Sequence, residues 1–417
     1  MTTSDISSVA DMTAARPPNG RRFLLVAFGV GASVGSVYSL LPLLVLASGG
    51  ASAQVGLLIA VVTVGMAIGA LGGGRFAGRH GADATLAMAI VLDLAGILIF
   101  LVPLPIVATA IGCLPMGAGV GLFWVASQVR LGQGSPRGFV RHYAAYTTGS
   151  AIGGPGSGVL VQSIAAGANE TAGEVRAAFL LAVLALALSA ICWPMRLGRL
   201  RATSASAAEL TRPPAAPVVR RTMRILRRGA SLQLADLALV VGFNAMLTIY
   251  AVVLRRDFRT EPAFIGLVAG GVAASKVVGG LVGRWLSARI GERSALVALS
   301  LAGALALGLG GLVHDRALFI VSVLLSILLG LGQWPLLVAV AMRHMPTEHR
   351  SAYVGSWNLR EFMVIAVASA TFGWGLDAMP GGRATVLLVG AGVLAIGACF
   401  TWRLGGIADV RSAERGR

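Results

Sequence analysis

Charged side chains and cysteines are scarce in this 417-residue chain. Only 12% of the residues are charged and 56% are apolar, with a mean hydropathy of +0.81. Soluble domains carry about twice that charged fraction, so the composition excludes this class and is typical of a protein with many membrane spans. The three cysteines, Cys113, Cys192 and Cys399, fall within apolar runs without paired spacing, which argues against disulfides and zinc.

Lysine is almost absent: Lys276 is the single lysine, against 33 arginines. It lies inside the apolar run 263–283, and about 20 apolar residues suffice to span a bilayer as a helix. A charge at that depth costs at least a few kcal/mol and usually faces a protein interior or a cavity. We therefore expect a membrane protein with a polar pathway through it.

Several functional motifs are missing as well. The sequence contains neither the GxxxxGK[ST] pattern of a P-loop nor the HExxH pattern of a zinc protease, so we expect neither ATP-driven transport by this chain alone nor an enzyme. No cofactor and no metal ion are expected. The five histidines are predicted to lie at loop ends, outside any intramembrane cluster: His80, His142, His314, His344 and His349.

Apolar runs predict twelve membrane-spanning helices. Their predicted ranges are 23–46, 54–73, 84–103, 106–127, 142–164, 177–194, 231–254, 263–284, 294–313, 317–341, 353–375 and 384–402. The chain then divides into an N-terminal tail (1–22), a first six-helix bundle (23–195), a basic linker (196–230), a second six-helix bundle (231–402) and a C-terminal tail (403–417). The linker holds nine arginines and one glutamate, Glu209.

The distribution of arginine predicts the orientation. With both termini in the cytoplasm, 26 arginines lie on the cytoplasmic side and six outside, and Arg360 lies within a span. Basic loops stay on the cytoplasmic side of a membrane protein. We expect a multi-pass protein of the cell membrane, monomeric in the lipid bilayer. The net charge of +17 lies between the spans, so no nucleic-acid partner is expected.

The two bundles carry traces of an internal repeat. When residues 55–86 are shifted by 210 positions, nine residues match without a gap, including Gly69 with Gly279 and Arg79 with Arg289. Repeated halves are typical of secondary transporters, which bind their substrates between the repeats.

Two motifs carry a family resemblance. Residues 74–81, GRFAGRHG, are similar to the G-x-x-x-D-R-x-G loop signature of the major facilitator superfamily, with Gly78 in place of the aspartate. Residues 150–158, SAIGGPGSG, are similar to its exporter-associated pattern G-x-x-x-G-P-x-x-G. The arginine of proton-coupled exporters in the fourth span is absent, and Cys113 stands at the matching place. The chain resembles this superfamily over nearly its whole length.

The resemblance implies an all-α membrane protein of two pseudo-symmetric six-helix bundles that rock around a central site. It places the first, fourth, seventh and tenth spans around the cavity, and the second, fifth, eighth and eleventh at the bundle interface. It also implies a gating loop and a motif that bends the fifth helix. The gating residues are Arg75, Arg79, Gly81 and Arg289, and the bending residues are Gly154, Pro155 and Gly158.

Charged residues within the spans are the main candidates for a substrate and proton pathway. Lys276 either attracts an anionic substrate or forms a structural ion pair with a carboxylate of another helix. Glu361 is one such partner, which would leave Arg360 for the substrate; alternatively, Lys276 and Arg360 hold a carboxylate together. Asp236 either binds protons or pairs with cytoplasmic arginines.

Polar and aromatic residues of the cavity spans are further candidates, about a third of which we expect to contact substrate; aromatic residues also anchor spans at the membrane interface. They are Tyr38, Trp124, Gln128, Asn244, Tyr250, Gln333 and Trp334, with Asn358 in the eleventh span. The leading hypothesis is a proton-coupled exporter of a small organic molecule, such as a drug or metabolite. The alternatives are a carrier or exchanger of organic anions, and a receptor or membrane-embedded enzyme on a transporter fold.

Overall fold

The computed structural model describes residues 20–132, 136–165, 171–193, 230–344 and 350–403, in which every secondary-structure element is a helix. The helices are α2 (Gly20–Ala47), α3 (Ser52–His80), α4 (Ala82–Phe100), α5 (Ile106–Gly132), α6 (Pro136–Ile164), α7 (Ala172–Ala178), α8 (Leu180–Cys192), α11 (Ala230–Arg256), α12 (Pro262–Ile290), α13 (Glu292–Leu312), α14 (Arg316–Leu329), the 3₁₀ turn η1 (Leu331–Gln333), α15 (Trp334–His344), α16 (Arg350–Ala378) and α17 (Gly382–Trp402).

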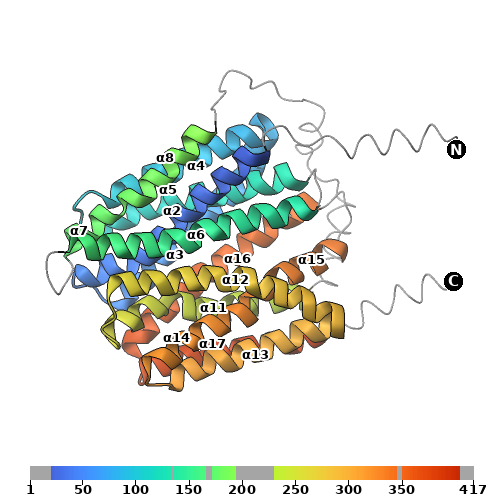
Figure 1. Ribbon diagram of the computed structural model, residues 1–417. Helices are drawn as coiled ribbons and strands as arrows, with labels where there is room; N and C mark the ends of the chain where they lie inside the picture. The colour runs from blue at the N-terminus through green and yellow to red at the C-terminus, as the bar shows by residue number, and fades with distance from the viewer. Residues whose placement is uncertain (1–19, 133–135, 166–170, 194–229, 345–349, 404–417) are drawn as a thin grey trace, which may run out of the picture.

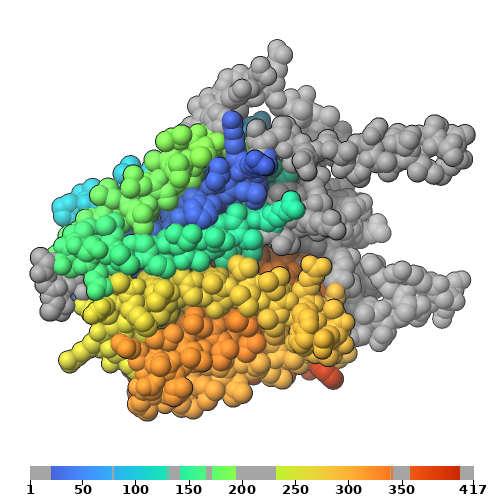
Figure 2. Space-filling view, viewed as in Figure 1, coloured from blue at the N-terminus to red at the C-terminus, as the bar shows by residue number. Residues whose placement is uncertain are grey.

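The helices form two bundles that lie side by side (Figures 1 and 2). We call α2–α8 the N-half and α11–α17 the C-half. Eleven spans in the described residues are long and apolar enough to cross a membrane. Helix α6 is the least apolar of the long helices; it packs between α2 of its own half and α12 of the other. The predicted fold class, an all-α protein of two six-helix bundles, is confirmed.

The two ends of the molecule differ. Helix α2 begins at Gly20 and α17 ends at Trp402 on the same side, which we call the tail end (Figure 1). We call the opposite side the loop end. There, short connections such as 48–51, 257–261 and 379–381 join consecutive helices.

Glycine sets how closely the helices approach. A Cβ atom on Gly31 of α2 would lie 1.9 Å from the carbonyl oxygen of Tyr146 in α6, and one on Gly117 of α5 would lie 1.9 Å from that of Val62 in α3. Carbon and oxygen atoms cannot approach so closely, so these helix pairs pack backbone to backbone. In a lipid environment, where helix association depends on close packing, small residues supply such contacts.

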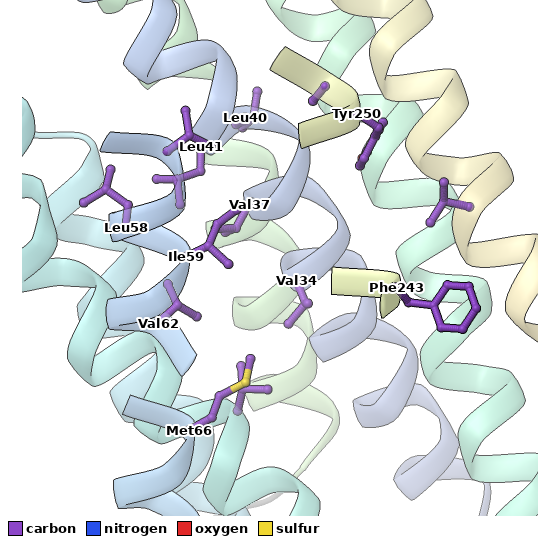
Figure 3. Close-up of a cluster of buried hydrophobic side chains, with 14 of the residues drawn as sticks. Val34, Val37, Leu40, Leu41, Leu58, Ile59, Val62, Met66, Phe243 and Tyr250 are labelled. Carbon is purple, nitrogen blue, oxygen red and sulfur yellow. The ribbon is translucent and has the colours of Figure 1, made fainter. Parts of the chain in front are cut away.

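A single apolar core joins the two halves. Figure 3 shows Val37 and Leu41 of α2 close to Leu58 and Ile59 of α3, with Tyr250 of α11 on the other side of α2. These side chains belong to one cluster of buried residues that also includes α12 and α16. The two halves are therefore packed against each other through apolar side chains.

Candidate functional site

Lys276 lies at the midpoint of α12, 14 residues from either end of the helix, or about 21 Å at 1.5 Å per residue. The exposed residues Leu267, Val278 and Leu281 follow one another at helical spacing and form the lipid-facing side of α12. Lys276 is on the opposite side, next to the buried Gly279. Its side chain therefore points toward the protein interior.

The side chain of Lys276 is only partly buried, although it points inward. Within the described parts of the chain, its ammonium group has neither a hydrogen bond nor an ion pair. The hypothesis of a structural pair with Glu361 thus finds no contact in its support.

The tenth span, predicted as continuous over 317–341, is interrupted. Helix α14 ends at Leu329, η1 comes next, and α15 begins at Trp334. The ring of Phe243 from α11 fills this place: a Cβ atom on Gly330 would lie 1.4 Å from Phe243 Cζ, and one on Gly303 would lie 3.3 Å from the same atom. The sequence signal for this break was the pair of glycines, Gly330 and Gly332, in the middle of an apolar span.

The break lies directly beside α12. A Cβ atom on Gly279 would lie 2.1 Å from the carbonyl oxygen of Leu328 and 2.7 Å from the Cα of Gly332. Gly279 is one turn from Lys276, so this inward-pointing cation lies close to the interruption. Interrupted spans expose backbone groups near mid-membrane and often form binding sites in transporters.

A second charged group lies between α11 and α16. Arg360 donates a hydrogen bond to the side-chain oxygen of Gln233, and both residues line a small cavity with Asp236 and Trp357. The cavity, about 10 Å³, has room for roughly one water molecule. Asp236 is 2% exposed, and its Oδ1 has no hydrogen-bond partner among the described residues.

Arg360 and Glu361 lie 10 and 11 residues from the start of α16, or about 15–17 Å along the helix. Lys276 is about 21 Å from the corresponding end of α12. Helix α12 continues to Ile290, six residues beyond the predicted span.

Two of the predicted polar candidates have structural partners. Asn244 Nδ2 donates to Ser369 Oγ at 2.6 Å and to the carbonyl oxygen of Ile365 at 3.3 Å, which ties α11 to α16. Gln333 is 1% exposed, and its Nε2 donates to Ser300 Oγ at 3.0 Å. Both side chains satisfy buried hydrogen-bonding groups between helices of the C-half.

A wall of aromatic rings faces the C-half. In it, Trp124 of α5 contacts Tyr146 of α6 with ring centroids 4.8 Å apart, and Tyr143 with centroids 6.2 Å apart. Tyr143 also faces Trp334 of the C-half, at 6.3 Å. All four rings are partly exposed, as is Tyr38 of α2, whereas Tyr250 of α11 is 5% exposed and belongs to the core.

A hydrogen bond crosses between the halves near this wall. Asn358 Nδ2 of α16 donates to Gln128 Oε1 of α5 at 3.2 Å. Gln128 is one turn from Trp124, and Asn358 is one turn from Glu361, so the amide pair lies on the same helix faces as the aromatic wall and the charged group. The geometry brings Trp124, Asn358 and Glu361 into one region between the halves.

One histidine prediction is wrong. His142 does not lie at a loop end but is fully buried in α6, where its ring stacks on Phe23 at 4.5 Å and on Phe123 at 5.4 Å. The helix begins at Pro136, six residues before the predicted start, which places His142 inside the bundle. In the described residues, no group of three or more His, Cys, Asp or Glu side chains could hold a metal ion.

The predicted bending motif lies at a seam between the halves. A Cβ atom on Gly158 of α6 would lie 2.4 Å from the carbonyl oxygen of Pro262 in α12, and one on Gly154 would lie 3.2 Å from that of Gly266. A Cβ atom on Gly270 of α12 would lie 2.7 Å from Cγ of Pro155. Helix α6 continues through Pro155 without a break. These residues let two backbones touch across the seam.

The residues of the predicted gating loop make few contacts with other helices. The side chains of Arg75 and Arg79 are exposed at the tail end of α3, and Arg289 stacks on Trp285 of its own helix at 4.5 Å. Gly81 ends α3 with a φ of +84°, a conformation that favours glycine.

An ion pair that was not predicted lies close by. The guanidinium of Arg130 in α5 binds the carboxylate of Asp83 in α4 and also stacks on Phe23 and Trp193. Asp83 lies five residues after Gly78, so the N-half has a carboxylate near the place where the superfamily signature has its aspartate.

Polar contacts also join the halves at the loop end. Asp377, at the end of α16, accepts a hydrogen bond from the backbone amide of Ala53 in α3 at 2.9 Å and one from Arg256 at 2.9 Å. Arg256 also donates to Ser52 Oγ at 3.2 Å. We call Asp377, Arg256 and the first turn of α3 the loop-end latch.

The other seam has a counterpart to this latch. Gln162 Nε2, near the end of α6, donates to the carboxylate of Glu261, the N-cap residue of α12, at 3.0 Å. Both contacts link the end of one seam helix with the start of its partner in the other half. They show that the space between the halves is closed at the loop end.

Comparisons with known proteins agree with this architecture. Residues 234–416 match the family model of the Major Facilitator Superfamily. A comparison with the sequences of curated proteins finds no match.

Among solved structures, the chain is similar to a bacterial homologue of the iron transporter ferroportin in its inward-facing state (TM-score 0.68, 13% identity, 92% of this chain and 98% of that one). It is also similar to the xylose transporter XylE from E. coli, in a partially occluded inward-open conformation (0.67, 15%, 92% and 97%). The nucleoside transporter NupG gives similar values (0.67, 12%, 92% and 98%). At such identities, the likeness shows the fold.

The arrangement of two helical bundles, the match of the C-half to the family model and the structural likeness over 92% of the chain therefore confirm the predicted resemblance: this is a membrane protein with the fold of the major facilitator superfamily.

Proposed function

We propose that the protein is a secondary transporter that moves a small organic molecule by alternating access and couples its export to proton entry. The observation that carries the proposal is Asp236, a buried carboxyl with an unpartnered oxygen beside Arg360 in the space between α11 and α16. An ionised carboxylate without sufficient partners is costly in such a place, and binding a proton removes that cost.

Alternating access is supported by the way in which the halves meet. The polar contacts at the loop end are few and each can break without disrupting a helix, whereas the seams consist of glycine-rich backbone contacts. Closure at the loop end then alternates with closure at the tail end around Lys276, Arg360 and Glu361. Charged residues inside a membrane protein commonly mark such a pathway.

The arginine distribution supports an orientation in which the tail end faces the cytoplasm and the protein is a multi-pass component of the cell membrane. When the loop end is closed and the tail end is open, the site communicates with the cytoplasm. A molecule to be exported binds from that side, and protons enter from outside after the loop end opens.

One observation favours a second function, the exchange of organic anions. Lys276 points inward at the middle of α12, is partly exposed and has no partner among the described residues. A lone cation in this position would attract a carboxylate, which Arg360 in the same half could help to bind.

Flux into and out of proteoliposomes distinguishes the two functions. Labelled organic cations, neutral compounds and carboxylates are tested with and without a pH gradient. Proton-coupled export predicts that substrate movement collapses with the gradient. Anion exchange predicts that carboxylate exchange persists without the gradient and disappears in Lys276→Ala. Movement of none of these compounds would contradict both functions.

Variants of the carboxyl groups test the coupling. We expect Asp236→Asn to abolish the dependence of flux on the pH gradient while exchange of substrate remains. Glu361→Gln tests the neighbouring carboxyl, and Asp315→Asn is a control, because Asp315 caps α14 at the exposed loop end. Full coupling in both Asp236→Asn and Glu361→Gln would contradict the assignment.

A further inference from the structure

One pair of aromatic rings spans the two halves. Tyr143 belongs to α6 of the N-half, and Trp334 is the first residue of α15 in the C-half, immediately after the break of the tenth span. Their ring centroids are 6.3 Å apart and their planes are inclined by 29°. Both rings are partly exposed although they lie between the bundles.

The separation of this pair differs from that of the other near-parallel rings in the described chain. Phe23 and His142 are 4.5 Å apart, and Phe123 is 5.8 Å from Tyr146. Aromatic rings in direct contact commonly have centroids about 4.5–7 Å apart, so Tyr143 and Trp334 are in contact near the upper end of this range. A third ring can enter between them only when the two halves move apart, because it needs about 3.5 Å on each of its faces.

The pair carries one hydrogen-bond donor without a partner. The indole nitrogen of Trp334 is buried and has no hydrogen-bond partner in the described residues. Buried donors normally have a partner, and one that lacks it is available to an acceptor on a ligand. The Asn358–Gln128 hydrogen bond also crosses between the halves, and Gln128 lies one turn from Trp124, whose ring contacts Tyr143.

We propose that the transported substrate is a flat aromatic compound whose ring inserts between Tyr143 and Trp334 and whose edge carries an acceptor for the indole N–H group. This inference rests on the proposed transport function and specifies its substrate class. A ring held in this way contacts both halves at once. Its binding therefore favours the arrangement in which the halves approach each other around it.

Equilibrium binding to the purified full-length chain in nanodiscs tests the proposal. The probes are three matched pairs: 2-naphthoate, 2-naphthylmethanol and 2-naphthylmethylammonium, each compared with its saturated decahydro analogue. The members of a pair share their charge and polar group, but only one has a flat π-system. We expect at least one naphthalene compound to bind about tenfold more tightly than its saturated analogue. The flat ring stacks on both Tyr143 and Trp334, and each stacking contact adds to the binding free energy.

The same preference is then measured in variants. Tyr143→Phe and Trp334→Phe should keep it, whereas Tyr143→Leu and Trp334→Leu should reduce it to about twofold or less. Trp374→Leu is the matched control, because Trp374 is 55% exposed on the lipid-facing side of α16 and should leave the preference unchanged. Thermal unfolding of each variant confirms that it is folded.

Three results would overturn the proposal: equal binding of both members in every pair, binding of no probe, or a preference that survives both leucine substitutions. The experiment measures binding and not flux. If the aromatic preference depends on Tyr143 and Trp334 but the protein moves no compound, the transport function is contradicted and the aromatic site is supported. If the protein moves only saturated compounds, the transport function is supported and the aromatic site is contradicted.

Discussion

Replacing Asp377 by alanine should open the loop end. The carboxylate accepts one hydrogen bond from the backbone amide of Ala53, at the positive end of the α3 dipole, and one from Arg256. A hydrogen bond to a charged group contributes about 1.5–3 kcal/mol. The ion pair with Arg256 joins two helices of the C-half and stays intact when the halves separate, so only the bond to Ala53 is lost. Since water replaces part of this bond when the latch opens, we expect a loss of about 1.4 kcal/mol, or a roughly tenfold shift of the equilibrium toward the loop-open arrangement.

Distances between spin labels report this shift. Labels at Val102 of the N-half and Leu312 of the C-half lie on exposed loop-end positions, 47% and 55% exposed, in a variant without the native cysteines. In Asp377→Ala, a longer-distance population should become dominant or grow strongly. Asp315→Asn, which alters a loop-end carboxylate within the C-half alone, should leave the distribution unchanged. An unaltered distribution in Asp377→Ala would refute the role of the latch.

Three further results are expected. Gln162→Ala removes the hydrogen bond to Glu261, which joins two exposed groups. The ratio of loop-open to loop-closed populations, measured with the same labels, should rise by no more than about fivefold. A larger effect than that of Asp377→Ala would contradict the ranking of the two contacts. Gly330→Ala should lower the thermal unfolding midpoint, because its Cβ would lie 1.4 Å from Phe243 Cζ. Adding Phe243→Leu to this variant should restore part of the loss. Equal midpoints for Gly330→Ala and wild type would show that the ring of Phe243 is not fixed there. Lys276→Met should fold with at least wild-type stability, because it removes an unpaired, partly buried cation and the desolvation cost of that cation; a large loss of stability would instead reveal a structural partner.

The fold could be predicted from the sequence because its determinants are local. Each long apolar run gives a helix, and the matching glycines at Gly69 and Gly279 occupy comparable places where helices touch backbone to backbone. The interior position of Lys276 was also predictable, since a charge in an apolar span cannot face lipid. Composition and residue spacing were therefore sufficient for these features.

The contact partners of individual side chains could not be predicted from composition and residue spacing. Whether Asn244 contacts a substrate or Ser369 depends on how two distant helices rotate against each other, and this rotation is set by packing over their whole lengths. The burial of His142 depended on a helix that begins six residues earlier than its hydropathy indicates. The pairing of Asp83 with Arg130 required knowledge of two helix ends that approach in space but not in sequence.

The glycine seams have a consequence for the energetics of rocking. At Gly56 and Gly373, as at Gly158 and Gly266, main chains meet with no interlocked side chains between them. At these positions one half can slide over the other without a change of side-chain rotamer. Single substitutions in the polar contacts at the loop end would then change the speed of the cycle while these glycine contacts stay the same.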